Sequence, residues 1–272
     1  MASPLVTPAE LDDLLGSVTL LDVRYQMGGP GGIALYLEGH IPFAQYVDLD
    51  TALAAPPGAG GRHPLPDPEV FGAAMRKAGV LADRPVVVYD DWQGRAAARC
   101  WWLLRHHGHR DVRVLDGGWS IWVAAGGAVE DGLRLPITGD FEPDPGTMPV
   151  VTAGEIPELV ERGVLVDARA PERFRGEVEP IDPVAGRIPG AVNVPTGVNV
   201  RADGAFRSPD ELRALYAVEG VTADTEIGVY CGSGVTAVHN ILALASAGID
   251  AALYPGSWSE WITDPEHPVA TG

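Results

Sequence analysis

Residues 227–232 read IGVYCG, and residues 86–91 read VVVYDD. Each stretch is an aliphatic run of strand length that ends in tyrosine and is followed by a polar residue or a thiol. Continuous apolar character over so short a run favours a strand buried on both faces, as in a parallel sheet. The same strand pattern in both halves of the chain suggests that one structural unit is encoded twice.

Five further pairs of similar segments follow the same order in the two halves. They are TPAELDDLL (7–15) with TAGEIPELV (152–160), LLDVR (20–24) with LVDAR (165–169), GHIPFAQYV (39–47) with GRIPGAVNV (186–194), PEVFGAAMRKAGV (68–80) with PDELRALYAVEGV (209–221), and LDGGWSIW (115–122) with LYPGSWSEW (253–261). Conserved order of this kind indicates a duplicated domain. We expect one domain at 1–125 and a second at 151–272, joined by a linker at 126–150 that is rich in Gly, Pro and acidic residues.

Each half has the local signals of an α/β domain. Thr7 with Glu10, and Thr152 with Glu155, have the spacing of a capping box, so a short helix should open each half. Aliphatic runs then alternate with longer helical patterns such as 95–107 and 236–247. We therefore predict an α/β fold in which each domain is a mainly parallel sheet flanked by helices on both faces.

Composition narrows the function classes. The 272-residue chain has a net charge of −18, which argues against nucleic acid and anionic membrane surfaces as partners. Its apolar runs are shorter than the ~18 residues of a membrane span, and its start lacks the basic, apolar pattern of a secretory signal. We expect a cytoplasmic protein. Its two cysteines form no zinc-like cluster, so neither a metal nor a cofactor is expected.

Cys231 follows a predicted parallel strand, at the sheet edge where such folds bind ligands. Gly232 and Gly234 allow backbone N–H groups to turn inward, and a helix is expected to begin near Thr236. Amides at a helix start stabilise anions, including a thiolate. Cys231 is thus a candidate nucleophile, although a lone cysteine is more often a small buried apolar residue. Cys100, within RCWWLL, fits that second description.

Two cysteine chemistries suit such a loop. A tyrosine-phosphatase site needs an arginine six residues after the cysteine to hold phosphate, and this chain has Ala237 there. Sulfur transfer needs less, because backbone amides can stabilise a persulfide without a side-chain clamp. The residues from Cys231 to Thr236 fit the second chemistry.

The paired LDVR/VDAR, GHIP/GRIP, VYD/VYC and DGGW/PGSW elements resemble those of tandem-domain rhodanese-family sulfurtransferases along nearly the whole chain. The loop CGSGVT is similar to the active loop of the 3-mercaptopyruvate sulfurtransferases, whereas thiosulfate-specific rhodaneses typically carry basic residues after the cysteine. The resemblance implies a catalytically silent N-terminal domain, in which Asp90 stands where Cys231 stands in the second copy.

The implied reaction moves sulfane sulfur from 3-mercaptopyruvate or thiosulfate to a thiol or cyanide acceptor through a Cys231 persulfide. Thioredoxin or a small thiol is the acceptor that the resemblance suggests. A strict thiosulfate:cyanide sulfurtransferase and a non-catalytic persulfide carrier are the alternatives.

The resemblance also implies the residues that bind the donor. Arg173 matches the family arginine that contacts the substrate carboxylate, with Arg169 in the same segment. Arg187 replaces the usual histidine of the GHIP element. Ile181 stands closest to the place of a second arginine of the animal enzymes. The alternative for Arg173 is an ion pair with one of three neighbouring acids, Glu172, Glu177 or Glu179.

The rest of the implied site lies in the loop and in the first domain. The backbone of Gly232, Gly234, Val235 and Thr236 would surround the transferred sulfur, with Thr236 also capping the following helix. The family has a Ser-His-Asp relay, in which Ser233 matches the serine and His40 the histidine. Residues 27–32 supply no aspartate, and Glu38 is a candidate substitute.

Overall fold

The computed structural model describes residues 3–25, 29–135 and 138–272. The chain forms two compact units. Unit 1 comprises the chain up to Ala55 together with Pro66–Met148 and Arg201–Phe206, and unit 2 comprises Pro56–Leu65, Pro149–Val200 and Arg207–Gly272. Residues 126–148, most of the segment expected to be a linker, therefore group with unit 1. Each unit also takes in a short segment from the other half of the sequence.

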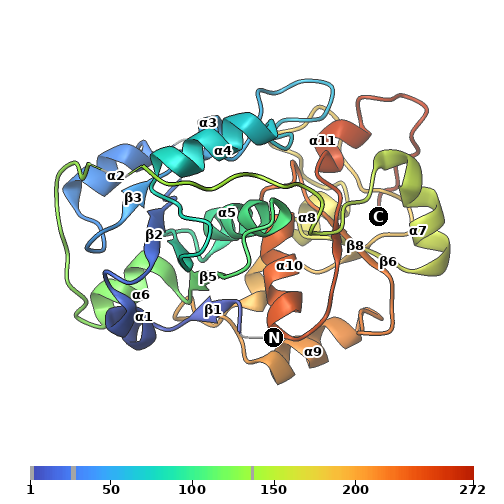
Figure 1. Ribbon diagram of the computed structural model, residues 1–272. Helices are drawn as coiled ribbons and strands as arrows, with labels where there is room; N and C mark the ends of the chain where they lie inside the picture. Colours follow the sequence, from blue (N-terminus) through green and yellow to red (C-terminus); the bar gives the residue numbers. More distant parts are fainter. Residues whose placement is uncertain (1–2, 26–28, 136–137) are drawn as a thin grey trace. The chain divides into compact units, whose positions relative to one another are not determined.

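Unit 1 is built on a five-stranded parallel sheet with the strand order β1-β5-β4-β2-β3 (Figure 1). The strands are β1 (Leu5–Val6), β2 (Thr19–Asp22), β3 (Gln45–Tyr46), β4 (Val86–Tyr89) and β5 (Val112–Leu115). The helices are α1 (Pro8–Leu14), α2 (Gly32–Glu38), α3 (Leu49–Ala52), α4 (Pro68–Lys77), α5 (Arg95–His106) and α6 (Gly118–Ala124). Helix α5 packs on β4 and β5.

Unit 2 repeats this plan with a four-stranded parallel sheet in the order β7-β6-β8-β9. The strands are β6 (Val164–Asp167), β7 (Val192–Asn193), β8 (Ile227–Tyr230) and β9 (Ala252–Leu253). The helices are η1 (Ala153–Glu155), α7 (Ile156–Arg162), α8 (Pro171–Phe174), η2 (Thr196–Asn199), α9 (Pro209–Ala217), α10 (Ala237–Ser246) and α11 (Ser257–Trp261). The predicted α/β class, with two sheets of parallel strands flanked by helices, is confirmed (Figure 1).

The expected helix starts are confirmed in both halves. Thr7 and Glu10 form a capping box at the start of α1, and Thr152 and Glu155 form one at η1, which leads directly into α7. Thr236 does occupy the position before α10, but its side chain makes no capping hydrogen bond. The expected capping role of Thr236 is therefore wrong. Its backbone is already helical, with φ −85° and ψ −15°, whereas a capping side chain normally needs an extended backbone.

The same buried ion pair recurs in both units. Pairing of β6 with β8 places Asp167 opposite Tyr230, and Arg169 binds Asp167 through Nε and Nη2 at 2.7–3.1 Å. The guanidinium also donates to the Gly186 carbonyl and lies 4.8 Å from the Trp258 ring. Nη1 lies 3.5 Å from Glu179, so each guanidinium nitrogen has a partner, and the charges are tolerated with the Arg169 side chain only 1% exposed.

In unit 1 the corresponding pair is Asp22 and Arg24. Their closest contact is 2.7 Å, the Tyr89 hydroxyl donates to Asp22 over 2.7 Å, and Arg24 lies over the Trp119 ring. In each copy, the aspartate of the ion pair lies at the end of one strand, opposite the tyrosine that ends the neighbouring strand of the sheet. This repetition of geometry supports a duplication more directly than sequence similarity does.

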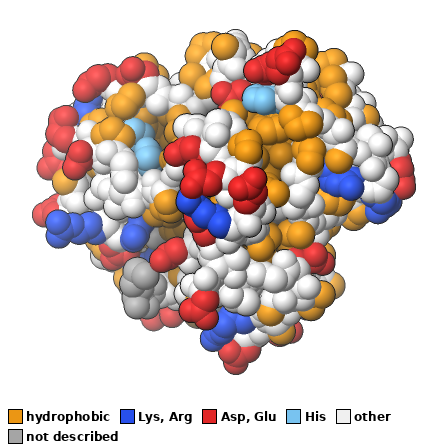
Figure 2. All heavy atoms as spheres, turned by 90° about the vertical axis from the view of Figure 1, so that its right-hand side faces the viewer, with side chains coloured by type: hydrophobic (Ala, Val, Ile, Leu, Met, Phe, Trp, Pro, Cys, Tyr) orange, Lys and Arg blue, Asp and Glu red, His pale blue; other side chains and the backbone are white. Residues whose placement is uncertain are grey.

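The excess of acidic over basic residues in the sequence is visible on the surface. Acidic side chains are distributed over the face shown in Figure 2 rather than gathered into one patch. Among the described residues, no helix is both long and apolar enough to cross a membrane.

We expect Asp22→Asn to lower the free energy of unfolding by about 3 kcal/mol, because it leaves the buried Arg24 guanidinium without its counter-charge. Urea titration followed by circular dichroism measures the change. Asp12→Asn, on the exposed side of α1, is the matched control. A loss below about 1 kcal/mol would show the pair to be no stronger than a surface salt bridge.

Candidate active site

Cys231 directly follows β8, at the carboxyl end of the unit 2 sheet. The residue is 1% exposed, and the Gly234 N–H donates to its Sγ over 3.1 Å. Gly234 has φ +77°, and a Cβ added to it would lie 2.2 Å from the Pro255 carbonyl oxygen. A side chain at Gly234 would therefore push apart the turn that aims this amide at the sulfur.

The loop is held from its other side by the residues that begin α11. The Cys231 N–H donates to Ser257 Oγ over 3.1 Å. In return, Trp258 N–H donates to the Cys231 carbonyl over 3.0 Å, and Ser259 N–H donates to the Gly232 carbonyl over 2.9 Å. These bonds fix the backbone on both sides of the thiol, so the position of Sγ does not depend on the loop alone.

Asp90 shows what the corresponding loop of unit 1 accommodates. Its Oδ1 accepts hydrogen bonds from the N–H groups of Trp92 and Gly94 at 2.9 and 2.8 Å, and its Oδ2 accepts one from Ala97 at 2.9 Å. Burial raises the pKa of Asp90, and these amides oppose the rise. The turn between strand and helix is thus an anion site filled by the protein's own carboxylate. A carboxylate cannot form a persulfide, so the unit 1 loop lacks the group for sulfur transfer.

Cys100 has a different environment. It lies within α5 with no exposed surface, and burial raises the pKa of its thiol far above the usual range. A thiol held protonated inside a helix packing face is a poor nucleophile.

A segment from the first half of the chain completes the surroundings of Cys231. Residues 56–65 belong to unit 2, and His63 Nδ1 lies 2.8 Å from Ser233 Oγ. The histidine at Ser233 is thus His63, which the sequence reasoning missed. It lies in a Gly/Pro-rich stretch, and no spacing or repeat relates it to a serine 170 residues later.

His40, the histidine expected from the resemblance, is part of unit 1. It is buried, stacks on Tyr36 and lies with Nδ1 2.9 Å from the Tyr36 carbonyl. Its Nε2 lies 3.9 Å from Glu130. These contacts are those of a packed histidine, and a catalytic role for His40 stays a prediction. Residues 26–28, which include the start of the segment without an aspartate, lie outside the described residues.

Two arginines lie beside the loop. Arg173, on α8, donates to Glu179 at 2.6 and 3.1 Å and to Asp182 at 3.2 Å, so one of the ion pairs considered above is present. Arg62 pairs with the other oxygen of Asp182. A Cβ placed on Gly232 would lie 2.9 Å from Arg62 Nη2 and 3.6 Å from each terminal nitrogen of Arg173. Both guanidinium groups therefore border the backbone next to Cys231.

Arg62 is electrostatically coupled to the thiol. Burial lowers the pKa of Arg62, and the largest opposing influence is Cys231. The side chain is 29% exposed, so solvent weakens this interaction. An arginine keeps its charge under such shifts, and Arg62 therefore supplies fixed positive charge near the sulfur.

The other two predicted arginines are engaged elsewhere in the fold. Arg169 is tied to Asp167 as described above. Arg187 donates to the Gly272 carbonyl over 2.7 Å and lies 4.5 Å from the Phe174 ring. Val235 is buried within the Cys231 loop. A donor-binding role for Arg169, Arg187 or Val235 stays a prediction.

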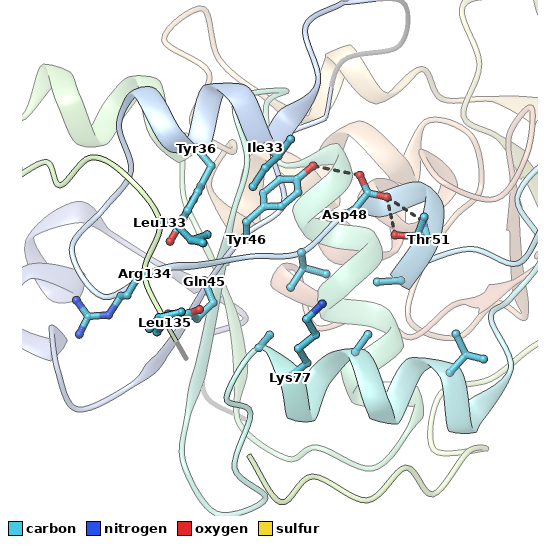
Figure 3. Close-up of a pocket in the computed structure, with 15 residues that line it drawn as sticks. Ile33, Tyr36, Gln45, Tyr46, Asp48, Thr51, Lys77, Leu133, Arg134 and Leu135 are labelled. Carbon is cyan, nitrogen blue, oxygen red and sulfur yellow. Dashed lines mark hydrogen bonds between the residues drawn. The ribbon is translucent and has the colours of Figure 1, made fainter. Parts of the chain in front are cut away.

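A separate cavity lies in unit 1. It has a volume of about 490 Å³ and is lined by Tyr36, Tyr46, Asp48, Lys77 and Leu133 among others (Figure 3). Tyr46 donates to Asp48, which also accepts from Thr51, so these three polar side chains are joined to one another (Figure 3). None of its lining residues belongs to the Cys231 loop. In the described part of the chain, no cluster of three or more His, Cys, Asp and Glu residues could hold a metal.

Comparison with known proteins gives one consistent result. A family model described as the rhodanese-like domain matches residues 7–125 and 152–264. A Mycobacterium tuberculosis protein that carries the name thiosulfate sulfurtransferase SseB is 46% identical over 282 residues, covering 98% of this chain and 97% of that protein. A Pseudomonas aeruginosa protein named as a 3-mercaptopyruvate sulfurtransferase is 47% identical over 262 residues, covering 93% of this chain and 92% of that protein.

A solved structure agrees with these relatives. The crystal structure of SseA from Escherichia coli, described as a 3-mercaptopyruvate sulfotransferase with the rhodanese fold, matches with a TM-score of 0.83 at 34% identity. The match covers 95% of this chain and 100% of that one. With both halves matched by the family model and relatives similar along nearly their whole length, the chain belongs to the rhodanese family and is a tandem-domain sulfurtransferase.

Proposed function

We propose that this enzyme takes sulfur from 3-mercaptopyruvate and passes it to a thiol through a persulfide on Cys231. The observation that carries the proposal is the grouping around one sulfur atom. Sγ accepts the Gly234 N–H, two arginines border the adjacent backbone, and the next side chain but one, Ser233, is paired with a histidine. This grouping offers a nucleophile, a carboxylate site and a proton carrier.

In the first step the Cys231 thiolate attacks the thiol sulfur of the donor. An S–S bond forms, the donor C–S bond breaks with its electron pair leaving on carbon, and the enolate of pyruvate departs. The product on the enzyme is Cys–S–SH. The enolate carbon then takes up one proton to give pyruvate, so atoms and charge balance.

Ser233 and His63 are placed to handle that proton. The hydroxyl lies within hydrogen-bond distance of the imidazole, a side chain that commonly acts as a general acid or base. Because Ser233 lies two residues after the attacking Cys231, the pair can serve the enolate that leaves the donor sulfur. Thiosulfate needs no such help, since its leaving group, sulfite, is stable as an anion.

Arg62 and Arg173 are placed to hold the donor carboxylate. Each guanidinium has planar donors that match a carboxylate, and their terminal nitrogens border Gly232 from two sides. In a protein of net charge −18, an anionic substrate needs directional hydrogen-bond donors of this kind.

The second step returns the enzyme to its starting state. An acceptor thiolate attacks the outer sulfur of the persulfide, and Cys231 leaves as a thiolate. We propose a small thiol or thioredoxin as the acceptor, in the cytoplasm. Thiosulfate is a second candidate donor, because the relative at 46% identity is named for it.

Cys231→Ser should abolish turnover and the mass increase of one sulfur atom after donor treatment, because a hydroxyl is not a comparable sulfur nucleophile. Intact-protein mass spectrometry and a pyruvate-release assay measure both. Cys100→Ser is the matched control and should retain activity, since that thiol is buried and protonated. Persistent turnover in the Cys231 variant would refute the nucleophile assignment.

The donors can be ranked by measuring kcat/KM with each one under a common thiol acceptor. We expect 3-mercaptopyruvate to exceed thiosulfate at least about tenfold, which corresponds to a difference of about 1.4 kcal/mol in transition-state binding. A higher value for thiosulfate would overturn the proposed order.

We expect His63→Asn to lower kcat with 3-mercaptopyruvate by about 100-fold and to change the thiosulfate reaction much less, because only the enolate needs a proton. Stopped-flow assays with each donor separate the two effects. His40→Asn, measured alongside, tests the histidine expected from the resemblance. Equal losses with both donors in the His63 variant would contradict a role in proton transfer.

A further inference from the structure

Asp182 joins the two arginines beside Cys231. Its Oδ1 pairs with Arg62 Nη1, and its Oδ2 accepts a hydrogen bond from Arg173 Nη2 over 3.2 Å. The Asp182 side chain is only 3% exposed, although the side chains of Arg62 and Arg173 are 29% and 15% exposed. One buried acid thus holds together two cations that come from segments far apart in the sequence.

Glu179 fixes the position of this acid. Its Oε1 accepts the backbone N–H groups of Ile181 and Asp182 at 3.2 and 3.1 Å, while the same carboxylate binds Arg173 along Nε and Nη2. The Glu179 side chain is likewise 3% exposed. The turn that carries Asp182 is therefore built around a second buried acid. Because both carboxylates are buried, solvent screens the charges of Asp182 and Glu179 only weakly.

The charges beside the Cys231 loop balance before any donor arrives. Arg62 and Arg173 contribute two positive charges, and Asp182 and Glu179 contribute two negative ones. The neighbouring pair of Arg169 and Asp167 is also neutral. The arginines that border Gly232 therefore offer directional hydrogen bonds in a site that has no net charge. The reacting Cys231 thiolate adds one negative charge to this site.

We propose that Asp182 determines the donor selectivity of this enzyme by cancelling one of these positive charges. The inference rests on the proposed function. 3-Mercaptopyruvate carries one negative charge at neutral pH, on the carboxylate that the arginines can hold. Thiosulfate carries two, and a balanced site beside a thiolate gives the second charge no counter-charge. Asp182 thereby disfavours the dianion while it positions the guanidinium groups for the carboxylate.

The test is the donor preference of Asp182→Asn, which removes the charge and keeps the size. The ratio of kcat/KM for thiosulfate to that for 3-mercaptopyruvate should rise about tenfold or more, because an unopposed positive charge a few ångströms away favours the dianion. The KM for thiosulfate should account for most of the rise. A purely structural defect would lower both reactions alike and leave the ratio unchanged.

Two variants serve as controls. Glu177→Gln makes the same change in net charge at an exposed pair with Arg175 and should leave the ratio unchanged. Asp182→Glu keeps the charge and should also keep the preference for 3-mercaptopyruvate, even if both rates fall. A ratio that rises equally in the Glu177 variant would overturn the local role of Asp182.

A measurement on the unaltered enzyme covers the case in which Asp182→Asn does not fold. Pyruvate, a monoanion, should inhibit persulfide formation more strongly than sulfate, a dianion, and stronger inhibition by sulfate would overturn the inference. Mass spectrometry of Cys231 separates this result from the underlying proposal. Absence of the sulfur adduct after 3-mercaptopyruvate treatment would refute the proposed function, whereas a normal adduct with an unchanged donor ratio would refute only the role of Asp182.

Discussion

The buried ion pair of Asp167 and Arg169 is the interaction on which the structure around Cys231 depends. It stands at the carboxyl end of β6, beside Tyr230, which immediately precedes Cys231. The Arg169 guanidinium also lies over the Trp258 ring, and Trp258 donates its backbone N–H to the Cys231 carbonyl. The ion pair is thus connected to Cys231 on two sides, through Tyr230 and through Trp258. A buried pair contributes little net stability but is costly to break, so it acts here mainly as a constraint on position.

The two copies of the strand–loop–helix element show how one backbone design serves two purposes. In unit 1 the inward-facing amides are satisfied permanently by Asp90, which is fully buried and hydrogen-bonded. In unit 2 the same position is a thiol that receives the Gly234 amide. An anion site whose anion is part of the protein is structural, whereas in the proposed reaction the Cys231 sulfur gains and loses a second sulfur.

In the proposed reaction, the charged groups around Cys231 would serve both catalysis and selection of the donor. His63 and Arg62 are neighbours on the segment 56–65, one paired with Ser233 and the other with Asp182. A single loop therefore contributes both the histidine at Ser233 and an arginine beside the Cys231 loop. In the proposed reaction, the buried acids balance the charge of these arginines, so that the site does not bind every anion equally. This balance favours a singly charged carboxylate over a more highly charged donor.

The sequence by itself determined the duplication, the α/β class, the strand and helix positions and the place of Cys231. These depend on local patterns such as apolar runs, capping spacings and a glycine-bearing turn after a strand. Only the tertiary structure decided that His63 faces Ser233, and that Asp182 joins Arg62 to Arg173. The contacts of Arg62 and His63 link residues more than a hundred positions apart through loops without periodicity, and no local rule of chain conformation reports them. The side chain of Thr236 likewise depended on a backbone angle that the residue type does not specify.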